Sequence, residues 1–278
     1  MDLETIIECD NETNIVNNSV CTVRLKRSQK KTNKIEEYRK KRKERRPEKR
    51  RERRRKKSEI RHKMLAAMTI NERREFISNE RREDKLQRIR IEENLVKSYN
   101  DGVVICVNCG FEDKMSDKEL GSLAKQISMV YNGIKKNMYN MQLHLSHFNE
   151  EGVLAHKLKK FSCEKWMIHK HTEDFWHIYE AKSIVVLSPD AGQDLEDVET
   201  DKIYIIGGLV DNETRIQSMT LGLECRRLPL DKYPLCKKKV LTIPTVVNIL
   251  AARLHGQAWV EAFEHFIPQN RLYKLPIV

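Results

Sequence analysis

The sequence has no run of apolar residues approaching the roughly 18 to 20 that an α-helix needs to cross a bilayer. Its first twelve residues, MDLETIIECDNE, contain five acids and neither lysine nor arginine. They resemble neither a secretory signal with a basic start nor an arginine-rich mitochondrial presequence. We therefore expect a soluble protein of the nucleus or the cytoplasm that does not contact a membrane.

Cysteine and glycine are present without the spacings that define common sites. The seven cysteines follow no framework spacing, so we expect free thiols. Cys106 and Cys109 form one C-x-x-C pair with histidines farther along, but no second pair stands at zinc-finger spacing, and we expect no metal. The GGLVD segment lacks both the Lys-Ser/Thr of a P-loop and the third glycine of a dinucleotide fingerprint.

Positive charge is missing from the first 22 residues and concentrated just after them. The whole chain has a net charge of +12. Residues 23–64 alone hold 23 Lys and Arg against six Glu, a local charge of +17, and residues 1–22 hold five acids and no base. The remainder from residue 65 onward is therefore neutral. The basicity belongs to one segment, which indicates an acidic tail over residues 1–22 and a basic arm over residues 23–98.

The arm has almost no apolar residue to bury, so it cannot fold by itself into a compact unit. Its Arg, Lys and Glu content favours a helix, although Pro47 interrupts it and no hydrophobic seam repeats along it, so we expect a helical or disordered arm. One interpretation is a solvated face or a nuclear-import signal. The other is direct contact with RNA phosphates, which such a charge density favours.

Residues 99–270 read as one α/β domain, followed by a tail over residues 271–278. Strands are predicted at 103–108, 141–145, 183–187 and 203–206, with a short strand ending at RRLPL. Helices are predicted at 116–134, 153–160, 245–256 and 257–266, with a small connector over 166–179 and a brief helical piece after the glycine pair. Ser116 and Glu119 form a capping box for the first helix. The alternation is typical of a doubly wound sheet.

The stretch KIYIIGGLVDNE, residues 202–213, organises this domain. Its β-branched and aromatic run predicts a buried parallel strand that ends at Gly207 and Gly208. Glycines leave room for a ligand to approach the backbone, at the carboxyl end where open α/β sheets bind their ligands. Asp211 then comes just past the strand, as a helix N-cap or as a carboxylate for proton transfer.

Six motifs in chain order resemble the tRNA purine-9 N1-methyltransferases, a monomeric branch of the SPOUT superfamily, and most closely their vertebrate B paralogue. The motifs are SIVVLSPD, LEDV, YIIGGLVD, RRLPLDKY, KVLTI and WVEAFEHFIP, spread over residues 183–268. The resemblance implies S-adenosylmethionine-dependent N1-methylation of position 9 of tRNA, most plausibly on guanine. It also implies a monomer with a SPOUT-type sheet and a carboxyl-terminal trefoil knot.

The resemblance also implies roles for individual residues. Asp211 would accept the proton that guanine N1 loses. The knot loops would hold the cofactor through Leu187, Ser188, Gly207, Gly208, Asn212, Glu213, Cys225, Leu228, Leu241 and Thr242. Residues of the domain and of the arm would contact tRNA, namely Gln126, Lys135, Lys136, Arg226, Arg53, Arg54, Arg55 and Lys56.

Three departures from the family pattern bear on function. Asn108 stands where the family usually has Asp, and Pro244 follows KVLTI. The connection from Asp211 to Arg226 is about five or six residues shorter than usual, so a helix of two turns barely fits. The alternative to an enzyme is therefore a tRNA-binding scaffold, or a subunit of a tRNA-processing complex, that keeps the fold without turnover.

Overall fold

A computed structural model describes residues 10–208, 213–233 and 240–272. The chain divides into two compact units, residues 1–81 and 82–278. Each unit is described by itself. Over the residues that the structure describes, no helix is both long and apolar enough to cross a membrane.

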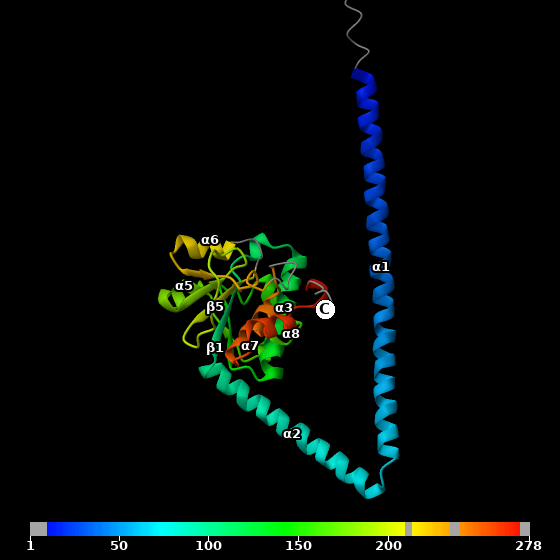
Figure 1. The fold of residues 1–278 in the computed structure, drawn as a ribbon, viewed down its shortest axis with the longest axis vertical. Coiled ribbons are helices and arrows are strands. Elements are labelled where there is room, and N and C mark those ends of the chain that lie inside the picture. The colour runs from blue at the N-terminus through cyan, green and yellow to red at the C-terminus, as the bar shows by residue number, and fades with distance from the viewer. Residues whose placement is uncertain (1–9, 209–212, 234–239, 273–278) are drawn as a thin grey trace, which may run out of the picture. The chain divides into compact units, whose positions relative to one another are not determined.

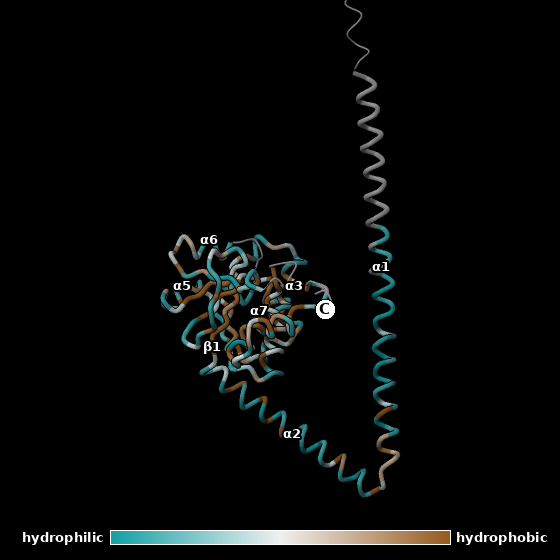
Figure 2. The backbone as a smooth tube through the Cα atoms, viewed as in Figure 1, coloured by the Kyte–Doolittle hydropathy of each residue, from teal (hydrophilic) through white to brown (hydrophobic). Residues whose placement is uncertain are grey.

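The N-terminal unit consists of helix α1, Asp10–Ala66, and the first part of α2, Ile70–Asp101. Helix α1 runs for 57 residues with Pro47 inside it, and its described portion is almost entirely hydrophilic (Figure 2). A capping box starts α2, because Thr69 N donates to Glu72 Oε2 at 2.8 Å and Glu72 N donates back to Thr69 Oγ1 at 3.4 Å. The arm is therefore helical in this structure.

The C-terminal unit contains one six-stranded sheet in the order β3-β2-β1-β5-β4-β6, and every paired neighbour is parallel (Figure 1). The glycine strand is β5, buried between β1 and β4. The prediction of an α/β domain is confirmed. The connector near Trp166 contains a two-residue strand that the sequence analysis did not predict, and Ser183 belongs to a turn before β4. The strands are β1 Val103–Asn108, β2 Met141–Ser146, β3 His169–Lys170, β4 Ile184–Leu187, β5 Ile203–Gly207 and β6 Glu224–Arg226.

Helices cover both faces of this sheet. On one face, α3, α7 and α8 enclose the larger hydrophobic core; on the other, α5 and residues next to α6 cover a smaller cluster around Phe175 (Figure 1). The α-helices are α3 Asp117–Asn137, α4 Val153–Lys159, α5 Phe175–Ile178, α6 Glu213–Thr220, α7 Ile243–Leu254 and α8 Trp259–Phe266. Short 3₁₀ turns are η1 Glu112–Lys114, η2 Cys163–Lys165, η3 Ala181–Ser183 and η4 Gln269–Arg271.

The predicted capping box at the start of α3 is confirmed. Ser116 N donates to Glu119 Oε2 at 2.8 Å, and Glu119 N donates to Ser116 Oγ at 3.4 Å. Leu120, Leu123 and Ile127 are buried on the face that this cap orients toward the sheet.

Two helices near the carboxyl end differ from the sequence prediction. Helix α7 starts at Ile243, two residues before the predicted start, and Pro244 lies in its first turn, where its missing N–H costs no intrahelical hydrogen bond. The shortened connection after the glycine pair still holds α6, a helix of eight residues. A two-turn helix therefore fits there.

Candidate active site

The described residues form a cavity at the carboxyl ends of β4, β5 and β6. Parallel strands end at the same edge of a sheet, so their following loops meet there. The loops after the three strands and the start of α7 supply the walls. The cavity is lined by Leu187, Ser188, Pro189, Ile206, Gly207, Thr214, Arg215, Arg227, Leu228, Leu230, Asp231, Val240, Leu241, Ile243 and Val246.

Backbone hydrogen bonds lock the loop after β4 to the end of β6. Ser188 N donates to Arg226 O at 2.9 Å, which extends the β4–β6 pairing by one step. Arg227 N then donates to Gln193 O at 2.9 Å, and Leu195 N donates to Arg227 O at 2.7 Å. This wall is held by main-chain contacts, so its shape depends little on which side chains face the cavity.

The two glycines at the end of β5, Gly207 and Gly208, have different surroundings. Gly207 lines the cavity. Gly208 instead lies against β1: its N donates to Asn108 O at 2.9 Å, and a Cβ on Gly208 would stand 2.6 Å from that oxygen and 3.1 Å from Leu123 Cδ2. Gly208 is thus needed for close approach of two backbone segments, and it is not among the described lining residues. Asp211 and Asn212 lie outside the described residues.

Asn108 joins the end of β1 to α6. Its side chain is almost fully buried, and its Nδ2 donates to Gln217 Oε1 at 3.3 Å and to Thr214 Oγ1 at 3.5 Å. Its Oδ1 accepts from Gly110 N at 3.1 Å. A neutral amide that both donates and accepts satisfies these partners without burying a charge, which gives Asn108 a physical role in holding α6 beside the cavity.

Two guanidinium groups face the cavity, with different partners. Arg227 Nε donates to Asp194 Oδ1 at 2.7 Å, and Arg227 Nη1 lies 3.2 Å from Asp231 Oδ2. The hydrogen bond to Asp194 raises the pKa of Arg227. Arg215 Nη1 donates to the backbone oxygen of Asp190 at 3.0 Å, and its Nε is buried with no hydrogen-bond partner among the described residues.

Gln126 ties α3 to the opposite wall of the cavity. Its Oε1 accepts from Ile243 N at 3.1 Å, at the first turn of α7, where backbone N–H groups have no intrahelical acceptor. Gln126 was predicted to contact the target nucleotide. In the structure its carbonyl oxygen positions the Leu241–Ile243 segment, and the contact with RNA stays a prediction.

The structure brings some of the predicted cofactor residues together and separates others. Leu187, Ser188, Gly207, Leu228 and Leu241 line the cavity, whereas Gly208, Glu213, Cys225 and Thr242 are not among its lining residues. Cys225 packs against the cluster on the other face of the sheet, and burial raises the pKa of its thiol. Glu213 instead pairs with Lys114 at 2.7 Å, and Thr242 Oγ1 lies 2.9 Å from Thr245 Oγ1.

The residues predicted to contact RNA are divided between the two units. Arg53, Arg54, Arg55 and Lys56 are exposed on α1. Lys135 and Lys136 are exposed in the last turn of α3, which is about 30 Å long at 1.5 Å per residue and begins at Asp117. Helix α3 connects the parallel strands β1 and β2, so it runs back from the carboxyl ends of the strands, and these lysines in its last turn lie toward the edge of the sheet opposite the cavity.

Arg226 is engaged by neighbours within the sheet region. Its Nε donates to Glu224 Oε1 at 2.8 Å, and its Nη1 donates to Gln193. It is Arg227, the next residue, that faces the cavity. Arg226 was the residue predicted from sequence. The sequence does not show which of two adjacent side chains at a strand end points toward the cavity.

Other lining residues were missed by the sequence analysis. Thr214 and Arg215 belong to α6, and Asp231, Val240 and Val246 come from the segments around α7. The only signal for them was their proximity to the glycine pair and to the LPL and LTI motifs. Which of their side chains point inward depends on how the separate loops converge.

The C-x-x-C pair is buried core. Cys106 and Cys109 are fully buried, and burial raises the pKa of the Cys106 thiol to about 11. Among the described residues, no three His, Cys, Asp or Glu side chains are grouped so as to hold a metal ion.

Comparisons with family models, curated proteins and solved structures all point to the same family. The model of the family described as tRNA (guanine(9)-N(1))-methyltransferase TRM10/TRM10A matches residues 23–272. The tRNA methyltransferase 10 homolog B of Danio rerio is 29% identical over 188 residues, 63% of this chain and 61% of that protein. The tRNA (guanine(9)-N1)-methyltransferase of Eremothecium gossypii is 29% identical over 65% of this chain and 63% of that protein.

The chain thus matches about three fifths of the length of these curated relatives. A crystal structure of full-length spTrm10 in complex with SAH superimposes with a TM-score of 0.54 at 28% identity, over 60% of this chain and 95% of that one.

Proposed function

The chain belongs to the TRM10/TRM10A family of tRNA (guanine(9)-N(1))-methyltransferases, and from this premise we propose that it methylates N1 of guanine 9 in tRNA with S-adenosylmethionine. The observation that carries this proposal is the cavity, which is assembled from the loops after β4, β5 and β6 and from the start of α7. These are the segments that carry the family motifs. A protein that only bound tRNA would not need a cavity there.

The residues present fit this cofactor. The aliphatic walls, including Leu187, Leu228 and Leu241, suit the adenine ring and the carbon chain of the ligand, while the buried Nε of Arg215 still needs an acceptor. When bound, S-adenosylmethionine supplies an electrophilic methyl group. The protein would bind and orient it largely through the loop backbones, since backbone hydrogen bonds already fix the wall formed by Ser188 and Arg227.

Proton transfer is the part of the reaction that needs an ionisable side chain. Guanine N1 carries a proton that leaves as the methyl group arrives. We assign its acceptance to Asp211, which follows the glycine pair in sequence and matches the family motif YIIGGLVD. In sequence, Asp211 comes four residues after Gly207, which ends β5 and lines the cavity.

The carboxyl-terminal part of the domain is proposed to form the trefoil knot of the SPOUT superfamily. Two observations support this. After β5 the chain returns to pair β6 with β4, and α7 then packs against α3 while its first turn joins the cavity wall. A knot would fix the three loops relative to one another without requiring side-chain contacts between them.

The tRNA partner is assigned to the arm and to the exposed lysines of the domain. Residues 23–64 carry the positive excess, and Arg53, Arg54, Arg55 and Lys56 are exposed on α1. Nucleic-acid backbones are bound by such helices through release of counterions.

Two measurements test the proposed function. Isothermal titration of the full chain with S-adenosylhomocysteine should show binding, and single-turnover assays with unmodified tRNA should yield 1-methylguanosine at position 9. A matched tRNA with adenine at position 9 distinguishes guanine from purine specificity. Cofactor binding without methyl transfer would favour the scaffold alternative, and absence of both would overturn the assignment.

A further inference from the structure

The cavity contains one guanidinium that no described carboxylate neutralises. Arg227 is paired with Asp194 and Asp231, so its charge is already balanced. Arg215 has no ion pair among the described residues, and its one hydrogen bond goes to a backbone oxygen. Among the described residues, Arg215 therefore brings a positive charge without an ion-pair partner to the α6 side of the cavity.

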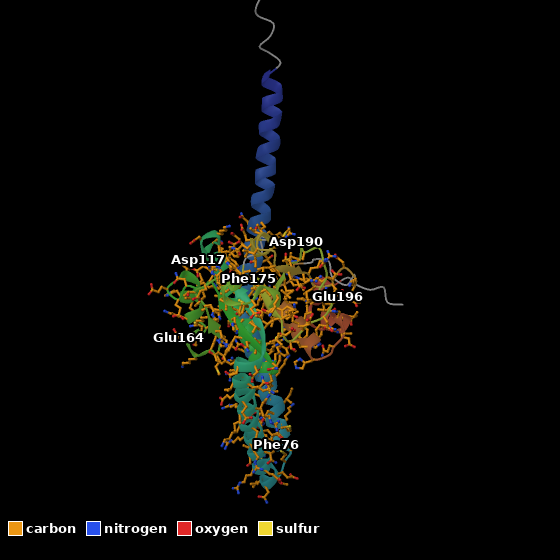
Figure 3. All side chains as sticks on the ribbon, turned by 90° about the vertical axis from the view of Figure 1, so that its left-hand side faces the viewer. Phe76, Asp117, Glu164, Phe175, Asp190 and Glu196 are labelled. Atoms are coloured by element: carbon orange, nitrogen blue, oxygen red, sulfur yellow. The ribbon has the colours of Figure 1, made fainter. Side chains whose placement is uncertain are left out.

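The position of Arg215 is fixed before any ligand arrives. It lies in the first turns of α6, which Asn108 holds through Thr214 and Gln217. Its Nη1 donates to Asp190 O at 3.0 Å, so the guanidinium joins α6 to the loop after β4 (Asp190 is labelled in Figure 3). A donor held this way loses little conformational entropy when it gains an acceptor.

The Nε of Arg215 is buried and makes no hydrogen bond with any residue that the structure describes. A buried donor without an acceptor costs free energy, and a charged one costs more than a neutral one. An anionic oxygen placed beside it would remove this cost and would balance the charge. Arginine is suited to a carboxylate because its planar donors match the two oxygens.

We propose that Arg215 binds the carboxylate at the amino-acid end of the cofactor and thereby sets which way the cofactor lies in the cavity. This inference rests on the proposed function. S-adenosylmethionine carries a positive sulfonium and an ammonium as well as the carboxylate, and the field of Arg215 attracts only the last of these. The apolar walls away from α6, formed by Leu241 and Val246, are left for the uncharged part of the ligand.

The experiment compares two ligands that differ only at the amino-acid end. S-adenosylhomocysteine has the carboxylate, and 5′-methylthioadenosine lacks the whole amino-acid portion. Calorimetric affinities of both are measured for the full-length wild type, Arg215→Met and Arg215→Lys. Arg226→Met is the matched control, because Arg226 is bonded to Glu224 and Gln193 and is not a lining residue.

We expect Arg215→Met to weaken the binding of S-adenosylhomocysteine on the order of 10- to 100-fold, the range for a charge-assisted hydrogen bond. The affinity for 5′-methylthioadenosine should change less than about twofold. The affinity of Arg215→Lys for S-adenosylhomocysteine should lie between those of the wild type and Arg215→Met, because lysine keeps the positive charge but lacks the planar pair of donors. An equal loss of affinity for both ligands would mean that Arg215 only holds the cavity wall in place, which would overturn the proposal. An unchanged affinity for S-adenosylhomocysteine would overturn it as well. Loss of tRNA affinity alone would assign Arg215 to an RNA phosphate. If the wild type binds neither ligand, the proposed function itself fails.

Discussion

Asp211 is the residue on which the proposed chemistry depends most. We expect Asp211→Asn to lower the single-turnover rate of methyl transfer by about 10²-fold or more, the usual contribution of a positioned base. The affinity for S-adenosylhomocysteine should hardly change, because an amide has the same shape. Rapid-quench assays across pH provide the measurement. A rate equal to that of the wild type at every pH would remove Asp211 from this role.

A second residue-scale feature is a stack of histidines on β2 and on and just after β3. Gln142 Nε2 donates to Asn100 O, so its Oε1 accepts from His144 Nε2 at 2.9 Å. His144 Nδ1 therefore accepts from the Tyr179 hydroxyl at 2.7 Å and lies 3.1 Å from His171 Nε2. Burial, with the nearby rings of His169 and His171, lowers the pKa of His144 to about 3.

This arrangement predicts an acid-sensitive fold. In the unfolded chain a histidine has a pKa near 6.5, so stability from the neutral His144 is complete above that pH. It falls by about 1.4 kcal/mol per pH unit as the pH drops from about 6.5 toward 3. Urea unfolding at pH 7.5, 6 and 5 should show this slope, and it should be smaller in His144→Gln. The exposed His156→Gln is the control, and an equal slope in all three proteins would exclude the histidine stack as the cause.

At the scale of elements, the β5–α6 connection requires a glycine for packing against β1. A Cβ on Gly208 would stand 2.6 Å from the carbonyl oxygen of Asn108. We expect Gly208→Ala to lower the free energy of unfolding by about 1 to 3 kcal/mol, as overpacking does. Gly192→Ala is the matched control, since a Cβ there meets nothing within 4 Å. A variant as stable as the wild type that had lost only ligand affinity would instead place Gly208 at the cofactor.

A side-chain hydrogen bond joins the packed helices α3 and α7 at the cavity wall. We expect Gln126→Ala to weaken S-adenosylhomocysteine binding, because the Ile243 N–H loses its acceptor and the Leu241–Ile243 wall is released. Gln126→Glu keeps an oxygen acceptor and should bind more tightly than the alanine variant. The alternative, contact with the target nucleotide, predicts slower methyl transfer with unchanged ligand affinity in both variants.

For the whole molecule, charge divides the chain into a basic segment, residues 23–64, and a remainder from residue 65 onward that is neutral overall. Removing residues 1–64 should leave S-adenosylhomocysteine binding unchanged and weaken tRNA binding, because that segment holds the positive excess. The slope of log K against log salt should also flatten, at roughly 0.7 to 0.9 per lost phosphate contact. Methyl transfer to tRNA by the truncated protein should partly recover at saturating concentrations of tRNA. Unaltered tRNA affinity and salt slope would make the arm a localisation signal or a solvated segment.

The sequence by itself determined the strands apart from β3, the capped helix α3, the family and the segments that enclose the cavity. These depend on local periodicity, on capping chemistry and on motifs whose order along the chain is specific. The sequence also predicted a brief helical piece after the glycine pair, and the structure has the eight-residue helix α6 there, Glu213–Thr220.

Only the tertiary structure decided which residues of those segments face the cavity. Cys225 and Arg227 are two residues apart, yet one packs behind the sheet and the other faces the cavity. Gly208 serves the contact with Asn108 rather than the lining, and Arg215 gains its significance from Asp190, 25 residues earlier in the chain. The physical reason is that side-chain direction at a strand end, and the charge balance around a buried donor, are set by neighbours distant in sequence. No local pattern encodes them.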